Sequence, residues 1–212
     1  MTPDYQIKNI KLYNCDNMEF MKDIPDNFYD LAIVDPPYKI KAFENLKINN
    51  NRIQKIFQRA ENFNNAKPTK EYFNELFRIS QKQVIWGANN FNLPPTEYFL
   101  IWNKEQTVDN FASAEYAWTN CKMPAKVFTY SIHKHKHTNK IHPTQKPVQL
   151  YKWILTNYAK EGFKIFDSHG GSFSSACACL DMGFDFDGCE IDKEYFDNAV
   201  KRLKNNNQEY LI

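Results

Sequence analysis

The chain has 212 residues, of which 42% are hydrophobic and 25% charged, and its formal net charge at pH 7 is +2. This length is enough for one α/β core and short for two, so a single domain over residues 1–212 is expected. No apolar run reaches the roughly 18 residues that a membrane-spanning helix needs. The first five residues lack the basic start and apolar stretch of a signal peptide, so we expect a cytoplasmic protein with no membrane partner.

The first part of the chain indicates strands that alternate with helices. Residues 7–13 alternate apolar and polar side chains as a strand does, and the short apolar run 29–34 ends at Asp35-Pro36-Pro37. Two prolines cannot continue a central strand, so the chain must turn there, at the strand's carboxyl end, where open α/β sheets bind ligands. A helix that opens at Thr69 and a strand over 83–87 then imply a β-α-β crossover.

Residues 40–67 are polar, rich in asparagine and without steady periodicity, which indicates a loop lying over the site. Basic residues are concentrated in residues 39–59 and again in residues 133–146. Such runs can be solvated surface and nothing more. Two of them beside candidate chemistry favour contact with nucleic-acid phosphates.

Residues 89–139 do not continue the alternation of strands and helices. They contain three strand-like runs, at 99–102, 114–118 and 127–130, which we interpret as antiparallel material inserted into a parallel core. The pattern as a whole predicts an α/β, Rossmann-like fold with an antiparallel insert.

The last third of the chain returns to strands and helices. Pro147 suits the first turn of a helix that Gly162 closes. A strand over 164–166 leads into a loop with two glycines and a helix of small residues, and a strand over 184–190 precedes a final helix. This arrangement repeats the β-α-β layout of the first part.

Neither cysteines nor histidines indicate a metal site. The five cysteines form no CxxC pair, and we interpret them as free thiols. His133, His135 and His137 alternate with lysines, so a metal site on one strand face is an alternative. Further ligands and supporting partners are not evident, so a basic DNA-contacting loop is favoured and no metal is expected.

The glycine-containing loop, residues 167–172, has the layout of a nucleotide-binding site. Gly170 and Gly171 let the backbone approach a ligand, and the following helix amino terminus favours an anionic group. Glu190, at the end of the next strand, can accept hydrogen bonds from ribose hydroxyls. The loop departs from GxGxxG, which argues against a phosphate-bearing dinucleotide. A plain strand-turn-helix is the alternative.

The turn Asp35-Pro36-Pro37-Tyr38 suits methylation of an amine whose lone pair is delocalised into a ring. Asp35 and the carbonyl of Pro36 can each accept one N–H of such an amine, and the rigid prolines hold both acceptors in place. The ring of Tyr38 offers a surface on which an extruded base can stack. A structural turn with a packed tyrosine is the alternative.

These motifs, in this order, resemble the permuted group of DNA amino-methyltransferases, in which the catalytic motif precedes the cofactor motif. Asp35-Pro36-Pro37-Tyr38 is similar to the family's catalytic tetrapeptide in its adenine form, whereas enzymes that act on cytosine more often begin it with serine. The resemblance implies S-adenosyl-L-methionine as cofactor, double-stranded DNA as partner and a circularly permuted methyltransferase fold. It implies catalytic roles for Asp35, Pro36, Pro37 and Tyr38. It implies cofactor contacts from Asp16, Thr144, Gln145, Lys146, Asp167, Ser168, His169, Gly170, Gly171, Ser172, Phe173, Ser174 and Glu190.

The cofactor loop departs from the family at three positions. The family has Asp-Pro-Phe where Asp167-Ser168-His169 stands, and glycine where Phe173 stands. His169 and Phe173 are therefore expected to contact the cofactor differently. Three alternatives stay open: a cytosine-N4 methyltransferase, an RNA amine methyltransferase, and a non-catalytic DNA-binding module that retains the fold.

Target recognition is expected from residues 89–139 together with the loop at 39–67. Base readout depends on side chains that enter a groove, and the region available for it is short. This favours either a short target or a second subunit, so a homodimer is a further expectation.

Overall fold

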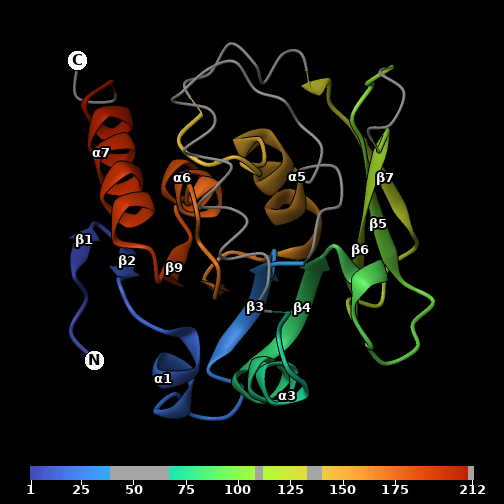
Figure 1. The fold of residues 1–212 in the computed structure, drawn as a ribbon, viewed down its shortest axis with the longest axis horizontal. Coiled ribbons are helices and arrows are strands. Elements are labelled where there is room, and N and C mark those ends of the chain that lie inside the picture. The colour runs from blue at the N-terminus through green and yellow to red at the C-terminus, as the bar shows by residue number, and fades with distance from the viewer. Residues whose placement is uncertain (39–66, 108–111, 133–139, 210–212) are drawn as a thin grey trace.

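The computed structural model describes residues 1–38, 67–107, 112–132 and 140–209 (Figure 1). The predicted loop at 40–67, apart from residue 67, the basic run 39–59 and the alternating histidines of 133–137 lie outside the described residues. Within the described segments, no helix combines the length and apolar character needed to cross a membrane. In the same part of the chain, no cluster of three or more His, Cys, Asp or Glu side chains could hold a metal ion.

Nine strands of the described residues form one sheet in the order β1-β2-β9-β8-β3-β4-β6-β5-β7. The five central strands, from β2 to β4, all run parallel. Their bounds, with those of the flanking strands, are β1 (Tyr5–Ile7), β2 (Ile10–Tyr13), β3 (Tyr29–Val34), β4 (Ser80–Trp86), β5 (Phe99–Asn103), β6 (Ala114–Thr119), β7 (Lys126–Thr129), β8 (Lys164–Asp167) and β9 (Asp185–Cys189).

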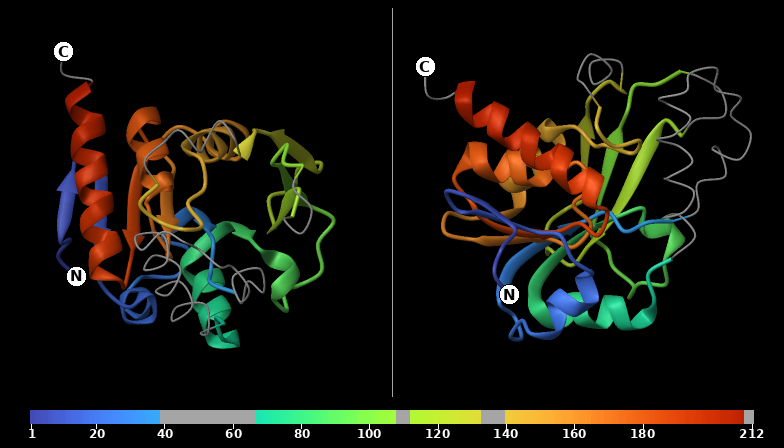
Figure 2. Two further views of the ribbon diagram at one scale, coloured as in Figure 1. Left: turned by 45° about the horizontal axis from the view of Figure 1, so that its top comes forward. Right: turned by 60° about the vertical axis from the view of Figure 1, so that its left-hand side comes forward.

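Helices cover both faces of this sheet (Figure 1). One face carries α5 (Val148–Tyr158), α6 (Ser174–Met182) and α7 (Lys193–Glu209), and the other carries α1 (Asn17–Lys22) and α3 (Lys70–Ile79). Figure 2 shows β1 and α7 at one side of the molecule and the β5–β7 strands at the other. The result is a three-layer α/β/α fold of the Rossmann-like type, as predicted.

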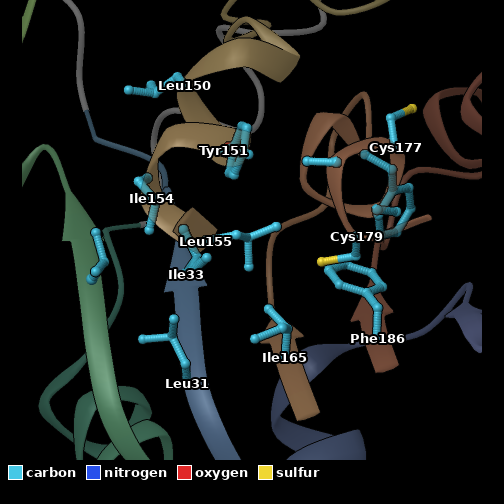
Figure 3. Packing of buried hydrophobic residues seen from close by; sticks show 14 of the residues in the cluster. Leu31, Ile33, Leu150, Tyr151, Ile154, Leu155, Ile165, Cys177, Cys179 and Phe186 are labelled. Carbon is cyan, nitrogen blue, oxygen red and sulfur yellow. The ribbon is translucent and has the colours of Figure 1, made fainter. Parts of the chain in front are cut away.

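Alternation along β3 divides the core in two. Leu31 and Ile33 pack with α5 and α6 on one face, as Figure 3 shows for Leu155 and Cys179, whereas Ala32 and Val34 face the α1 and α3 side. Because a strand buried on both faces needs apolar side chains at every position, β3 is the near-continuous apolar run that the sequence shows. Such a strand is held rigidly, and the residues that follow it are therefore well fixed.

The order of the strands confirms the permuted arrangement. The tetrapeptide that begins at Asp35 follows β3, and the glycine-containing loop follows β8, which comes far later in the chain. These two strands are neighbours in the sheet and pair in parallel, with Leu31 opposite Ile165. Their carboxyl ends therefore bring the two predicted motifs to the same edge of the sheet.

Two predictions about strands were wrong. Residues 7–13 are not one strand: Ile7 ends β1, the chain turns at Lys8 with a φ of 51°, and Ile10 begins β2 and pairs with Ile7 in an antiparallel hairpin. The third strand of the region 89–139 is also not antiparallel: β7 runs parallel to β5, and only β6 is antiparallel to its neighbours β4 and β5. Local side-chain pattern carries no information about strand direction, which is why these strands could be predicted but their pairing could not.

Candidate active site

Asp35 lies directly after the buried strand β3 and contacts a lysine from a distant part of the chain. Lys146 Nζ forms an ion pair with Asp35 Oδ2. The lysine side chain is only 4% exposed and the aspartate side chain 18%. Lys146 was predicted to be a cofactor contact, and that role stays a prediction; the structure places its ammonium group against Asp35.

Lys146 has a second carboxylate partner, which sequence reasoning missed. Glu115 of β6 places Oε2 3.1 Å from Lys146 Nζ, and its Oε1 lies 2.5 Å from Lys104 Nζ. We call Asp35, Lys146, Glu115 and Lys104 the lysine–carboxylate cluster. The only sequence signal for Glu115 was an acid within an otherwise mostly apolar strand.

Burial and the neighbouring charges have opposing effects on the pKa values of the cluster. Burial alone would lower the pKa of Lys146, but Asp35 and Glu115 raise it well above its ordinary value. Burial likewise works against ionised Glu115, yet Lys146 and Lys104 bring its pKa below the ordinary value. Burial raises the pKa of Asp35, with Lys146 opposing and Glu115 adding to the effect. Asp35 is therefore an unusually good proton acceptor for a paired carboxylate.

The second oxygen of Asp35 lacks a hydrogen-bond partner within the described part of the chain. Oδ1 is buried and has no hydrogen-bond partner among the described residues. A buried acceptor without a partner is costly, and in a native site it marks a place where a ligand donates. Since Lys146 holds Oδ2, Oδ1 is the atom left to accept an N–H from a substrate.

The ring of Tyr38, the last residue of the same tetrapeptide, fits into space that a glycine leaves open. A Cβ atom on Gly87, the residue after β4, would overlap the Tyr38 ring, and Gly87 also has a φ of 67°. The ring edge meets Phe91 at a centroid distance of 6.1 Å. Burial raises the pKa of Tyr38 to about 12, so its phenol stays neutral near pH 7.

The glycine-containing loop is bonded to the end of β9. Gly170 N donates to Cys189 O at 2.8 Å, and Gly171 N donates to Glu190 Oε2 at 2.7 Å. Glu190 Oε1 also accepts from Asp192 N at 2.8 Å, and burial raises the pKa of Glu190 to about 7. A carboxylate has lone pairs beyond these two bonds, so Glu190 retains capacity for ribose hydroxyls.

Asp167 organises the start of the same loop. Its carboxylate accepts from Ser175 Oγ at 2.6 Å and from His169 N at 3.1 Å, and burial raises its pKa to about 6. Asp167 thereby joins β8 to the first turn of α6. Its role in the structure is to set the shape of the loop.

Ser168 and His169, two departures from the family, belong to a polar network with α1 and α3. Ser168 Oγ lies 2.7 Å from Tyr72 Oη and 2.9 Å from His169 Nδ1, while Asn17 Nδ2 lies 3.0 Å from His169 Nε2. Burial lowers the pKa of His169 to about 4, so the ring is neutral near pH 7. Neither Asn17 nor Tyr72 was predicted as a site residue, because contacts between elements cannot be read from local pattern.

Phe173, the third departure, packs into the core. Its side chain is fully buried under Gly170 and meets Phe186 and Phe196 at centroid distances of 6.3 and 6.4 Å. Its φ of 48° is the left-handed conformation that a glycine would adopt without strain. Its ring therefore packs beneath Gly170 and into the hydrophobic core.

The remaining predicted cofactor residues have these positions. Asp16 caps α1, where its side chain accepts from Met18 N and Glu19 N, and it is exposed. Ser172 Oγ and Ser174 Oγ are 3.2 Å apart. Thr144 Oγ1 lies 3.1 Å from His142 Nδ1, and Gln145 Oε1 accepts from Ile141 N at 3.1 Å. A Cβ atom on Gly171 would lie 3.5 Å from the His142 ring, so this segment rests against the glycine-containing loop.

Fold and site together define a Rossmann-like protein with two motifs at one sheet edge: a glycine-containing loop and a buried carboxylate with one oxygen that has no partner among the described residues. A family model described as DNA methylase matches residues 58–201, and the chain belongs to this DNA methylase family.

Curated relatives agree with this membership. The type II methyltransferase M.HinfI of Haemophilus influenzae is 24% identical over 242 aligned positions, which cover 89% of this chain and 67% of that protein. The DNA adenine methyltransferase YhdJ of Escherichia coli K12 is 37% identical over 62 positions, covering 29% of this chain and 21% of that protein.

Solved structures share the fold. The M1.HpyAVI complex with SAM has a TM-score of 0.57 at 22% identity and covers 91% of this chain and 99% of its own. The cytosine-N4-specific PvuII DNA methyltransferase has a TM-score of 0.64 at 13% identity, and the match covers 94% of this chain and 88% of the PvuII chain. PvuII DNA methyltransferase is cytosine-N4-specific whereas YhdJ is a DNA adenine methyltransferase, so these likenesses do not distinguish adenine from cytosine.

Proposed function

We propose that this protein transfers a methyl group from S-adenosyl-L-methionine to the N6 amine of adenine in double-stranded DNA. The observation that carries the proposal is Asp35 Oδ1, a buried acceptor at the carboxyl end of β3 without a partner among the described residues. An exocyclic amine supplies the N–H that this atom lacks. A non-catalytic DNA-binding module would have no use for such an acceptor, because an unpaired buried oxygen only costs stability.

The residues at the ends of β8 and β9 fit the cofactor. When bound, S-adenosyl-L-methionine supplies a methyl group on a positively charged sulfur. Glu190 would accept from its ribose, and the backbone of Gly170 and Gly171, which is closely joined to β9, would line it. Asp16 and the segment Thr144-Gln145 are proposed to complete the binding site.

Each catalytic residue has one task in the proposed reaction. Asp35 Oδ1 accepts an amine N–H and so favours the pyramidal amine, whose lone pair is free to attack the methyl group. Tyr38 stacks on the extruded base, and Lys146 fixes Asp35 through Oδ2. After transfer the nitrogen carries one proton too many, and the raised pKa of Asp35 suits this carboxylate to receive it.

Adenine is proposed over cytosine because the tetrapeptide begins with Asp35 and because YhdJ, a DNA adenine methyltransferase, is similar over part of the chain. The likeness of the fold to PvuII DNA methyltransferase supports cytosine-N4 as the second candidate. We further propose that residues 89–139 carry target recognition with the loop at 39–67, that a second copy of the chain completes the DNA contact, and that the protein acts in the cytoplasm.

Mass analysis of nucleosides separates these candidates. Purified protein with S-adenosyl-L-methionine and mixed-sequence duplex DNA is expected to yield N6-methyladenine. A parallel reaction with total RNA is expected to yield no methylated base. N4-methylcytosine in the DNA, or methylation of RNA alone, would overturn the proposed substrate.

Cofactor binding should depend on pH through Glu190. Its carboxyl has a pKa of about 7 in the free protein, raised by burial, and ribose hydroxyls prefer the ionised form. Below that pH a proton must leave before binding, so affinity should fall by up to about tenfold for each pH unit under 7 and level off above it. Calorimetric titration of wild type and Glu190→Gln across this range checks the effect. Ionisation of the cofactor itself affects wild type and Glu190→Gln alike. If both proteins show the same pH dependence of affinity, Glu190 is not the group responsible.

A further inference from the structure

Glu115 has no task in the proposed reaction, yet it is a largely buried carboxylate in contact with two lysines. Its side chain is 19% exposed on β6, and it contacts both Lys146 and Lys104. Burying an ion pair gains little stability over an apolar side chain of similar volume. A buried glutamate between two lysines therefore calls for a functional reason.

The formal charges of the four groups in the lysine–carboxylate cluster cancel. Two ammonium groups and two carboxylates sum to zero, and they are linked in the order Asp35, Lys146, Glu115, Lys104. Without Glu115 the remaining three groups carry one excess positive charge. Lys146 would then keep Asp35 as its one carboxylate partner in the cluster.

The net charge of the cluster matters because a charged ligand would lie close to Asp35. If Asp35 accepts an N–H of the target amine, the methyl donor must lie next to that amine. The donor is a sulfonium cation, whereas the thioether product that it leaves behind lacks this charge. A cluster with excess positive charge would repel the donor and leave the product unaffected.

We propose that Glu115 is a positioning residue that keeps the lysine–carboxylate cluster neutral, so that Lys146 can fix Asp35 without repelling a cationic methyl donor. This inference rests on the proposed function, because that function places the methyl donor close to Asp35. Lys104 is then the counterion that prevents Glu115 from adding excess negative charge. The net charge of the cluster thus sets the affinity for the cationic donor relative to that for its uncharged thioether product.

Two single variants should shift this discrimination in opposite directions. Glu115→Gln makes the cluster more positive, and Lys104→Met makes it more negative. The affinity for S-adenosylmethionine relative to S-adenosylhomocysteine should fall about tenfold in Glu115→Gln and rise by a similar factor in Lys104→Met. The double variant should return close to the wild-type ratio. Calorimetric titration of both ligands gives each ratio without any turnover.

Controls separate charge from structural damage. Glu97 is exposed, so Glu97→Gln should keep the wild-type ratio. A general loss of packing would weaken both ligands alike, so equal shifts in the single variants, or unchanged ratios, would overturn the inference. If Glu115→Gln does not fold, Lys104→Met still tests it, because Glu115 then keeps Lys146 as its partner. Nucleoside analysis of the wild type tests the proposed function separately: opposite ratio shifts without any methylated base would contradict only that function.

Discussion

Replacing Asp35 by asparagine should slow methyl transfer to DNA by about a hundredfold to a thousandfold, whereas the affinity for S-adenosyl-L-methionine should fall by no more than about tenfold, the effect of one excess positive charge in the cluster. The reason lies in Lys146, which donates to Oδ2 of the wild-type carboxylate. In the variant the amide oxygen must face this ammonium group. The amide NH2 then points to where Oδ1 lay, and donor meets donor when the target amine arrives.

Single-turnover methylation of duplex DNA measures this loss, and titration with the cofactor measures binding. Asp185→Asn is the matched control, because Asp185 is an exposed residue at the start of β9 and should retain the wild-type rate. Full turnover by Asp35→Asn would remove Asp35 from the proposed mechanism. A loss of cofactor affinity as large as the loss of rate would instead assign Asp35 to cofactor binding.

Replacing Lys146 by methionine should lower the free energy of unfolding by about 3–5 kcal/mol. This change leaves Asp35 without its partner and Glu115 with Lys104 alone. Deprived of Lys146, both carboxyls should bind protons more readily in the folded protein than in the unfolded chain. The stability of the variant should therefore fall as pH rises, and the loss should be smaller at about pH 5 than at about pH 8.

Urea unfolding at the two pH values tests both parts of this prediction. Lys193→Met is the control, because Lys193 pairs with Asp197 at 2.5 Å on the surface, with side chains 68% and 48% exposed. Removing such an exposed pair should cost less than about 1 kcal/mol. Equal losses in the two variants would mean that the pair between Lys146 and Asp35 is no stronger than a surface contact.

The sequence predicted those features that depend on neighbouring residues. β3 and the turn at Asp35 were visible because an apolar run meets two prolines, and the loop after β8 because two glycines follow a strand. Their adjacency in the sheet was not predicted and comes from the parallel pairing of β3 with β8. Family resemblance added the permuted order.

Contacts between distant residues could not be predicted in the same way. Asp35 and Lys146 are 111 positions apart, and the partner Glu115 comes from a third element. The motif around Lys146 identified a segment near the site, but it could not show which group its ammonium would meet. Similarly, the departures at Ser168 and His169 were apparent, whereas their bonds to Tyr72 and Asn17 depend on how α1 and α3 pack against the sheet.

Phe173 has a consequence for the thermodynamics of the loop. A glycine at this position would leave the backbone free to sample many conformations before a ligand arrives, whereas the buried ring ties Gly170 and the start of α6 to the hydrophobic interior. The left-handed backbone of Phe173 costs about 1 kcal/mol, which burial of an aromatic ring outweighs. The loop is thereby preorganised, so a ligand that binds there loses little conformational entropy in ordering it.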